Sequence, residues 1–191
     1  MFKDYLFYVV GDSPLLMHSP RSMTISGGRA GKRKKIPLPE EEAEMGTYRD
    51  DKGYLVFPTS GFRKAFLRAM SGYKVGKKAL RTLLSHVRTD GEWAYLVHPQ
   101  TKKKIKNYKI DIRRAVIQRS AVWRARPMLE EWATEIIFRM NAEIAGMDEE
   151  ALLKQSEAIL NEAGQTIGVG DYRLEREGWF GMFHVEKSEI R

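Results

Sequence analysis

The sequence of 191 residues contains no cysteine. This absence excludes disulfide bonds, thiol catalysis and cysteine-containing zinc sites, so a stable core has to come from side-chain packing. No apolar run approaches the ~20 residues that a membrane-spanning helix requires, and the first residues show no charged segment followed by a continuous apolar one. We therefore expect a cytoplasmic protein that has no contact with a membrane.

Recognised catalytic and cofactor-binding motifs are also missing. The glycine-rich segment GVGDYRLEREGWFG contains no GxGxxG before a helix and no GKS or GKT, which argues against a dinucleotide fold or a P-loop. The histidines have neither the spacing of metal ligands nor a nucleophile motif around them; they are His18, His86, His98 and His184. We predict no catalytic residue, no metal and no cofactor. One alternative stays open, because a histidine beside a basic cleft can act as general base on a ribose 2′-OH, and His18 is the candidate.

Positive charge is abundant. The formal net charge of +8 favours an anionic partner such as nucleic acid. The stretch from Lys102 to Arg126 holds ten basic residues and one acid, Asp111, with Tyr108 and Trp123 among them. A protein that binds a nucleic-acid strand needs cations that contact the phosphates and flat rings that stack on the bases, and this stretch contains both. The alternative is that these residues only solvate one face of a hairpin. From this stretch we predict phosphate contacts by Arg113, Arg114, Arg119 and Arg124, and base contacts by Trp123.

Residues 19–51 differ in composition from the rest of the chain. Four adjacent cations, Lys32, Arg33, Lys34 and Lys35, follow a glycine-containing stretch, and then the acids from Glu40 to Glu44 reverse the sign of the charge. Few residues here could be buried, so we expect an exposed, flexible insertion in a single domain that spans residues 1–191. The four cations either form an arm that closes over a strand of nucleic acid or pair with the acids of the same loop.

The remaining pattern alternates strands and helices. Phe62, Ala65, Phe66 and Ala69 have the spacing of a buried helix stripe, with Thr59 or Ser60 as N-cap. Predicted strands cover Tyr5 to Val10, Trp93 to His98, Asn107 to Val116, Glu131 to Met140 and Phe180 to Val185, a short helix covers Ala79 to Val87, and a longer one runs from an Asp148 N-cap to a Gly164 C-cap. The order is that of a ferredoxin-like, RRM-like βαββαβ fold of the α+β class, an antiparallel sheet with its helices on one face.

Three segments resemble motifs of the RAMP superfamily, the RRM-like RNA-binding proteins of CRISPR effector complexes. GYLVFPTSGFRKAFLRA at Gly53 to Ala69 is similar to the family's signature of an apolar strand, a Pro-small-Ser-small turn and a basic helix. VVGDSPLLMHS at Val9 to Ser19 looks like its first strand with a Ser-Pro-Leu turn. IGVGDYRLEREGWFGMF at Ile167 to Phe183 resembles its glycine-rich loop and last strand, although the acids in this loop are a departure from the family pattern.

The resemblance is closest to the backbone subunits that polymerise along guide RNA in antiviral defence, in which a thumb follows the first strand. It implies that residues 19–51 are this thumb and that the protein binds single-stranded RNA, or single-stranded DNA, without catalysis. It also implies partners among copies of the same chain and other CRISPR effector subunits. By analogy, Ser60, Arg63 and Lys64 would hold the phosphate backbone, and Tyr172 and Arg173 would lie beside it.

Other functions stay open at this point. The chain is short for such a subunit, so a compact relative encoded by a virus or mobile element is an alternative origin. A metal-independent endoribonuclease that processes repeat RNA, with His18 as base, is a second function, and a protein-binding mimic or inhibitor of a CRISPR complex is a third.

Overall fold

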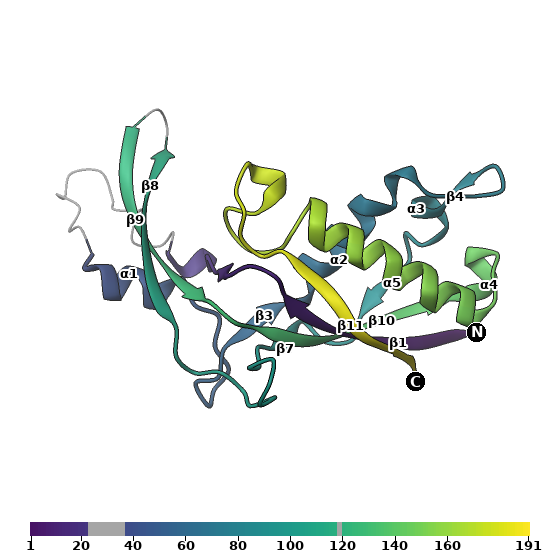
Figure 1. Cartoon of the computed structure of the whole chain (residues 1–191), viewed down its shortest axis with the longest axis horizontal. Coiled ribbons are helices and arrows are strands. Elements are labelled where there is room, and N and C mark those ends of the chain that lie inside the picture. The colour runs from purple at the N-terminus through teal and green to yellow at the C-terminus, as the bar shows by residue number, and fades with distance from the viewer. Residues whose placement is uncertain (23–36, 118–119) are drawn as a thin grey trace.

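The computed structural model describes residues 1–22, 37–117 and 120–191, and it belongs to the α+β class with antiparallel sheets. Its central sheet has four strands in the order β11-β1-β10-β6, and every neighbouring pair is antiparallel. These strands are β1 (Phe2–Gly11), β6 (Arg88–Thr89), β10 (Ala133–Asn141) and β11 (Phe183–Ile190). The last strand, β11, therefore lies at one edge of this sheet, beside the first strand (Figure 1).

The side chains at the centre of β1 are buried on both faces of the sheet. Tyr5, Phe7 and Val9 alternate along the strand and belong to the main hydrophobic core. Leu6 and Tyr8, which alternate with them, lie on the opposite face, where they line a hollow. A strand that is buried on both faces reads as a continuous apolar run, which is how Tyr5 to Val10 reads in the sequence.

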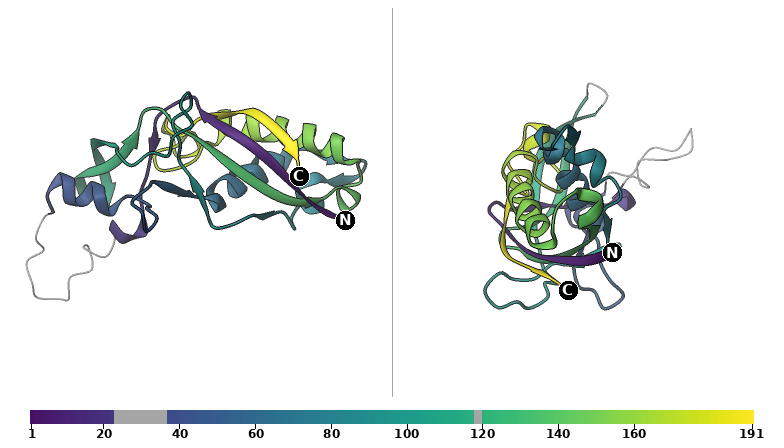
Figure 2. Two further views of the ribbon diagram at one scale, coloured as in Figure 1. Left: turned by 90° about the horizontal axis from the view of Figure 1, so that it is seen from below. Right: turned by 90° about the vertical axis from the view of Figure 1, so that its right-hand side faces the viewer.

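Two helices cover one face of this sheet. They are α2 (Thr59–Ala69) and α5 (Glu149–Thr166), which pack against each other, and α5 also packs on β11 (Figure 2). The predicted stripe of α2 is confirmed, since its four apolar members are all buried. Phe66 from this stripe packs against Phe138 of β10, with 4.9 Å between ring centroids.

The predicted helix ends are partly wrong. The start of α5 is confirmed, because the Asp148 carboxylate accepts a hydrogen bond from the backbone N–H of Ala151. Gly164, however, lies within α5 and not at its C-cap, and a side chain there would meet the backbone of β11. At the start of α2, Thr59 does not act as N-cap, since its hydroxyl donates to the carbonyl of Gly91 and thereby ties the helix to a neighbouring loop.

A second, smaller sheet extends beyond the central one. It has the order β2-β9-β8, where β8 (Lys109–Ile117) and β9 (Ser120–Leu129) form a long hairpin and β2 (Leu15–Leu16) pairs with the base of β9. The hairpin leads away from the four-stranded sheet, and α1 (Pro39–Met45) packs against it (Figure 1). The predicted strand from Asn107 to Val116 corresponds to β8.

The expectation of an exposed segment throughout residues 19–51 is wrong for its second half. α1 falls in this range, and Ala43 is fully buried. The helix is held because the Glu42 carboxylate accepts the backbone N–H of Ala125 on the free edge of β9 and pairs with Arg124 of the same strand at 2.7 Å. The arm at residues 32–35 lies outside the described residues.

Short elements complete the fold. β3 (Val56–Pro58) pairs with β7 (Trp93–Tyr95), and the helix predicted from Ala79 to Val87 is reduced to one turn, α3 (Leu80–Leu83). The others are η2 (Met70–Gly72), β4 (Lys74–Val75), β5 (Lys78–Ala79), α4 (Ala142–Ala145) and η3 (Leu174–Arg176). Within the part of the chain that is described, no helix has the length and apolar character that crossing a membrane requires.

Candidate nucleic-acid interface

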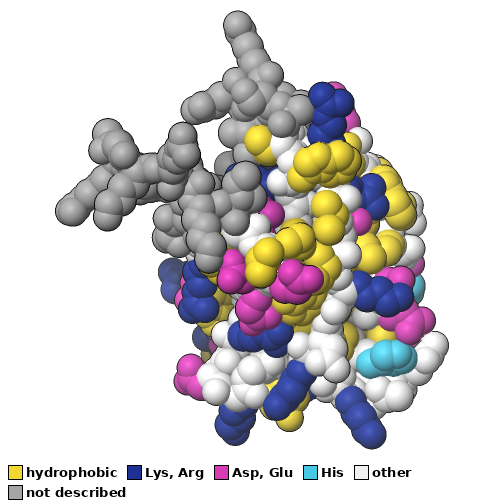
Figure 3. Space-filling model, turned by 90° about the vertical axis from the view of Figure 1, so that its left-hand side faces the viewer, with side chains coloured by type: hydrophobic (Ala, Val, Ile, Leu, Met, Phe, Trp, Pro, Cys, Tyr) yellow, Lys and Arg dark blue, Asp and Glu magenta, His cyan; other side chains and the backbone are white. Residues whose placement is uncertain are grey.

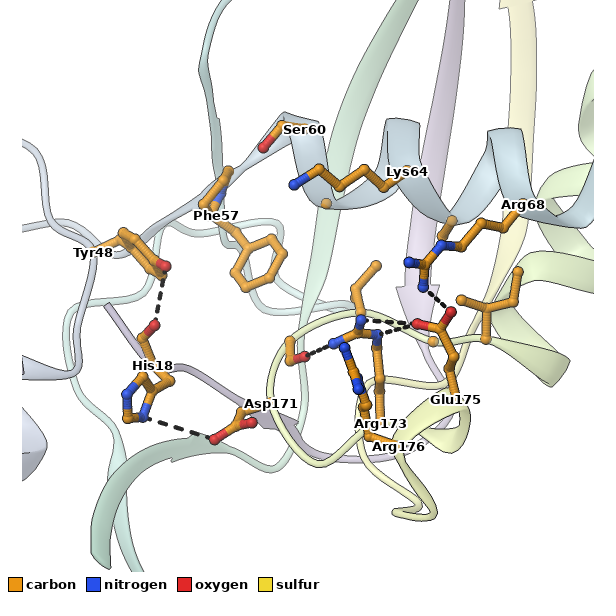
Figure 4. Close-up of a pocket in the computed structure, with 17 residues that line it drawn as sticks. His18, Tyr48, Phe57, Ser60, Lys64, Arg68, Asp171, Arg173, Glu175 and Arg176 are labelled. Atoms are coloured by element: carbon orange, nitrogen blue, oxygen red, sulfur yellow. Dashed lines mark hydrogen bonds and ion pairs between the residues drawn. The ribbon is translucent and has the colours of Figure 1, made fainter. Parts of the chain in front are cut away.

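A cleft of about 460 Å³ lies between α2 and the glycine-rich loop that connects α5 to β11. Figure 4 shows the two walls and the residues between them. The loop supplies residues from Ile167 to Arg176, one face of α2 supplies the opposite wall, and His18 closes one end together with Tyr48. All three segments that resemble RAMP motifs therefore contribute to one cleft.

The α2 wall presents polar side chains at regular intervals. Ser60, Lys64 and Arg68 are each four residues apart, so they share one face of the helix, and all three are exposed and line the cleft. Arg63, the third predicted contact, does not join them. Its guanidinium donates from Nε to the carbonyl of Val87 at 2.7 Å and from Nη2 to that of Ser85 at 3.2 Å, and so it holds a loop on another side of the helix.

The opposite wall depends on its glycines. Gly170 has a φ of +81°, and a Cβ on it would lie 2.5 Å from the carbonyl oxygen of Leu16. Only glycine combines this backbone conformation with so close an approach, so the loop can lie directly against β2. Arg173 is fixed on this wall, since its Nη1 donates to the Gly170 carbonyl at 3.1 Å, and Arg176 lies beside it.

Positive charge dominates the cleft. Its lining includes Lys64, Arg68, Arg173 and Arg176 against two acids, Asp171 and Glu175. Burial lowers the pKa of Arg173, and the neighbouring charges of Arg176 and Arg68 lower it further. Four cations against two acids leave the cleft with a net positive charge, which favours an anionic ligand such as phosphate.

His18 lies where the cleft meets β2. Its Nε2 is 3.1 Å from the hydroxyl of Ser22, and its Nδ1 is 3.7 Å from the Asp171 carboxylate, which itself pairs with Arg126 at 2.7 Å. Burial lowers the pKa of His18 below its ordinary value of 6.5, although Asp171 acts in the opposite direction. The imidazole is therefore mainly neutral near pH 7.

The hairpin cations differ in their partners. Arg113 pairs with Asp111 at 2.8 Å and its guanidinium lies 4.6 Å from the ring centroid of Phe180, and Arg124 pairs with Glu42 of α1. These two arginines lie opposite each other at the middle of the hairpin, where Arg113 contacts Phe180 and Arg124 contacts α1. By contrast, Arg114 and Trp123, opposite each other in the register of β8 and β9, are exposed, with 72% of Trp123 accessible.

The remaining predicted residues lie apart from the cleft or cannot be placed. Tyr172 is 43% exposed and follows Asp171 in the loop, but it is not part of the cleft lining. Lys32, Arg33, Lys34, Lys35 and Arg119 lie outside the described residues. The prediction missed Arg68 and Arg176. For Arg68 a signal existed, because it stands four residues after Lys64, but nothing in the sequence places Arg176 against α2.

Other surfaces show mixed charge. A hollow of about 700 Å³ on the sheet face that the helices leave open contains four acids, Asp90, Glu135, Glu186 and Glu189, and four cations, Lys102, Lys104, Lys187 and Arg191. At the hairpin end of the molecule, basic side chains lie interspersed with acidic and hydrophobic ones (Figure 3). Neither surface favours a polyanion as the cleft does.

Neither the protein-family models nor the curated proteins that we searched match this chain. Among the described residues, no group of three or more histidine or carboxylate side chains is placed to hold a metal ion. Any function proposed for the chain therefore rests on its own residues.

Proposed function

We propose that the protein binds single-stranded nucleic acid, preferably RNA, with the phosphate backbone held in the cleft between α2 and the glycine-rich loop. The observation that carries this proposal is the convergence of three separate segments on one cleft that contains Lys64, Arg68, Arg173 and Arg176. Phosphate contacts supply most of the affinity for nucleic acid, and exposed rings such as Trp123 supply stacking platforms near the hairpin.

We further propose that the fold is ferredoxin-like and of the RAMP type. The sheet order β11-β1-β10-β6, with α2 between β1 and β6 along the chain and α5 between β10 and β11, supports this proposal. The association with CRISPR assemblies and the polymerisation along a strand follow from the resemblance alone. A fold by itself does not assign a function, so nucleic-acid binding has to be tested before the CRISPR association and the polymerisation.

Fluorescence anisotropy with a labelled RNA oligonucleotide tests the binding. If the four cations each neutralise one phosphate, log K falls with log salt with a slope of about −2.8, which is a loss of about 50-fold between roughly 50 and 200 mM salt. A DNA oligonucleotide of the same sequence measures the preference for RNA. An affinity that does not change with salt would contradict the proposal.

Lys64 offers the sharpest single variant. Lys64→Gln is expected to weaken binding about 5- to 10-fold, because one cation of the cleft is lost. Lys77→Gln is the matched control, since Lys77 is exposed in the β4–β5 turn and not in the cleft lining, and it removes the same charge. Equal effects of the two variants would show that only net charge matters and that the cleft is not the site.

A second candidate function is the cleavage of RNA with His18 as general base. The specific observation in its favour is that His18 lines the cleft and that burial lowers its pKa, so a neutral imidazole is available near pH 7. Incubating labelled RNA with the wild type and with His18→Ala decides between the two. Product that forms with the wild type alone would replace the non-catalytic proposal.

A further inference from the structure

One acid occupies the centre of the basic cleft. Glu175 pairs through Oε1 with Nη1 of Arg68, and its Oε2 accepts from Arg173, at 3.2 Å from Nε and 2.8 Å from Nη2. Arg68 belongs to α2 and Arg173 to the glycine-rich loop, so this carboxylate connects the two walls (Figure 4). Glu175 thus lies where the proposed function requires a phosphate.

A carboxylate and a phosphate can occupy the same position between Arg68 and Arg173. Guanidinium groups bind carboxylates and phosphates with the same paired N–H···O geometry. The Arg173 guanidinium is held by the Gly170 carbonyl, and the backbone of Arg68 is fixed in α2, so one ligand can reach both guanidinium groups. A phosphate oxygen pair can therefore replace the two oxygens of Glu175 without moving either wall.

Glu175 can leave this position at small cost. It lies in η3, in which no residue is buried, and 29% of its side chain is exposed. Glu175, Arg176 and Glu177 are exposed, so this turn of the loop lies at the surface. Rotation of one side chain into solvent breaks two partly exposed ion pairs, each of which stabilises the protein only modestly.

We infer that Arg68 and Arg173 form a phosphate subsite which the Glu175 carboxylate fills in the free protein, so that a nucleic-acid strand binds by exchanging its phosphate for this carboxylate. The inference rests on the proposed function and adds to it that Glu175 sets the affinity. Every binding event loses the two ion pairs of Glu175 before it gains the phosphate contacts. Removing the carboxylate alone should therefore strengthen binding.

Two variants test this directly. Glu175→Gln keeps the size of the side chain and removes its charge, and Glu186→Gln is the matched control, because Glu186 also forms an exposed ion pair, with Lys102, but lies on the opposite face of the sheet. In anisotropy with labelled RNA, we expect Glu175→Gln to bind about tenfold more tightly than the wild type, while the control changes by less than about twofold.

A probe without bases separates the subsite from the proposed function. Inorganic pyrophosphate should raise the melting temperature of Glu175→Gln more than that of the wild type or the control, and the gain should vanish in Arg68→Gln/Glu175→Gln. If the wild type binds no oligonucleotide but pyrophosphate stabilises Glu175→Gln selectively, the result supports the phosphate subsite and contradicts the nucleic-acid function. If Glu175→Gln and Glu186→Gln respond alike to both probes, the inference is overturned while the function stands or falls on its own test.

Discussion

Gly164 supports a quantitative prediction about how α5 lies on the sheet. A Cβ added at this position would lie 1.8 Å from the carbonyl oxygen of Phe183 and 2.7 Å from its carbonyl carbon. Both atoms belong to the backbone of β11, so no side-chain rotation can relieve the contact. Gly164→Ala therefore has to push the helix and the strand apart, and this disturbs Phe183, whose ring packs 5.5 Å from that of Phe62.

Two opposing effects decide the size of the change. Alanine stabilises a helix interior by about 1 kcal/mol relative to glycine. Overpacking of a core costs about 1–3 kcal/mol, and a clash between two backbones belongs at the upper end of this range because neither side yields. We expect Gly164→Ala to lose about 2 kcal/mol of unfolding free energy, which for a chain of this size lowers Tm by about 4–8 °C.

Urea unfolding followed by circular dichroism measures this loss. Gly72→Ala serves as control, because a Cβ at Gly72, at the end of η2, has nothing within 4 Å. The control should stay within about 0.5 kcal/mol of the wild type. A Gly164→Ala protein as stable as the wild type, or more stable, would mean that helix propensity prevails and that α5 does not approach β11 so closely.

Three further changes have distinct readouts. Arg124→Gln should lower the unfolding free energy by about 1–2 kcal/mol in urea, because it leaves the partly buried Glu42 without its ion pair, and it should change RNA affinity less than Lys64→Gln does. Burial lowers the pKa of His18, so as the pH falls the imidazole is protonated in the unfolded chain before it is protonated in the folded protein. The stability that the neutral imidazole provides is therefore complete above about pH 6.5 and declines as the pH falls through that value. His18→Gln should flatten this decline between about pH 7 and 5 in thermal melts. Gly178→Ala places a Cβ 1.7 Å from the Tyr172 carbonyl oxygen, so it should distort the loop and weaken RNA binding at least about fivefold in anisotropy while far-UV circular dichroism stays unchanged.

Periodic and local signals in the sequence were sufficient for several elements. The stripe of α2 follows from the spacing of its apolar residues, and the start of α5 follows from Asp148, whose side chain caps the next turn. Such features depend on residues within one or two turns of each other. The same holds for the strand that became β8.

Features that depend on distant residues were not predictable. α1 has seven residues, three of them acids in its first turn, and Ala43 as its buried residue, so its own pattern is that of a solvated loop. What holds it is an edge N–H and an arginine of β9, more than 80 residues away. Arg63 was misplaced for a similar reason, since the carbonyls that it binds come from a loop more than 20 residues further on.

The number of basic residues in a stretch of sequence overestimates how many of them can bind phosphate. Three arginines of the basic stretch from Lys102 to Arg126 pair with acids: Arg113 with Asp111, Arg124 with Glu42 and Arg126 with Asp171. Except for Asp111, these acids lie outside the stretch. The charge of the stretch is therefore strongly positive in the sequence but is partly neutralised in the folded protein. In the cleft, by contrast, four cations meet two acids. The affinity for a strand then depends on how readily each cation exchanges its present partner for a phosphate, and for Arg68 and Arg173 this partner is Glu175.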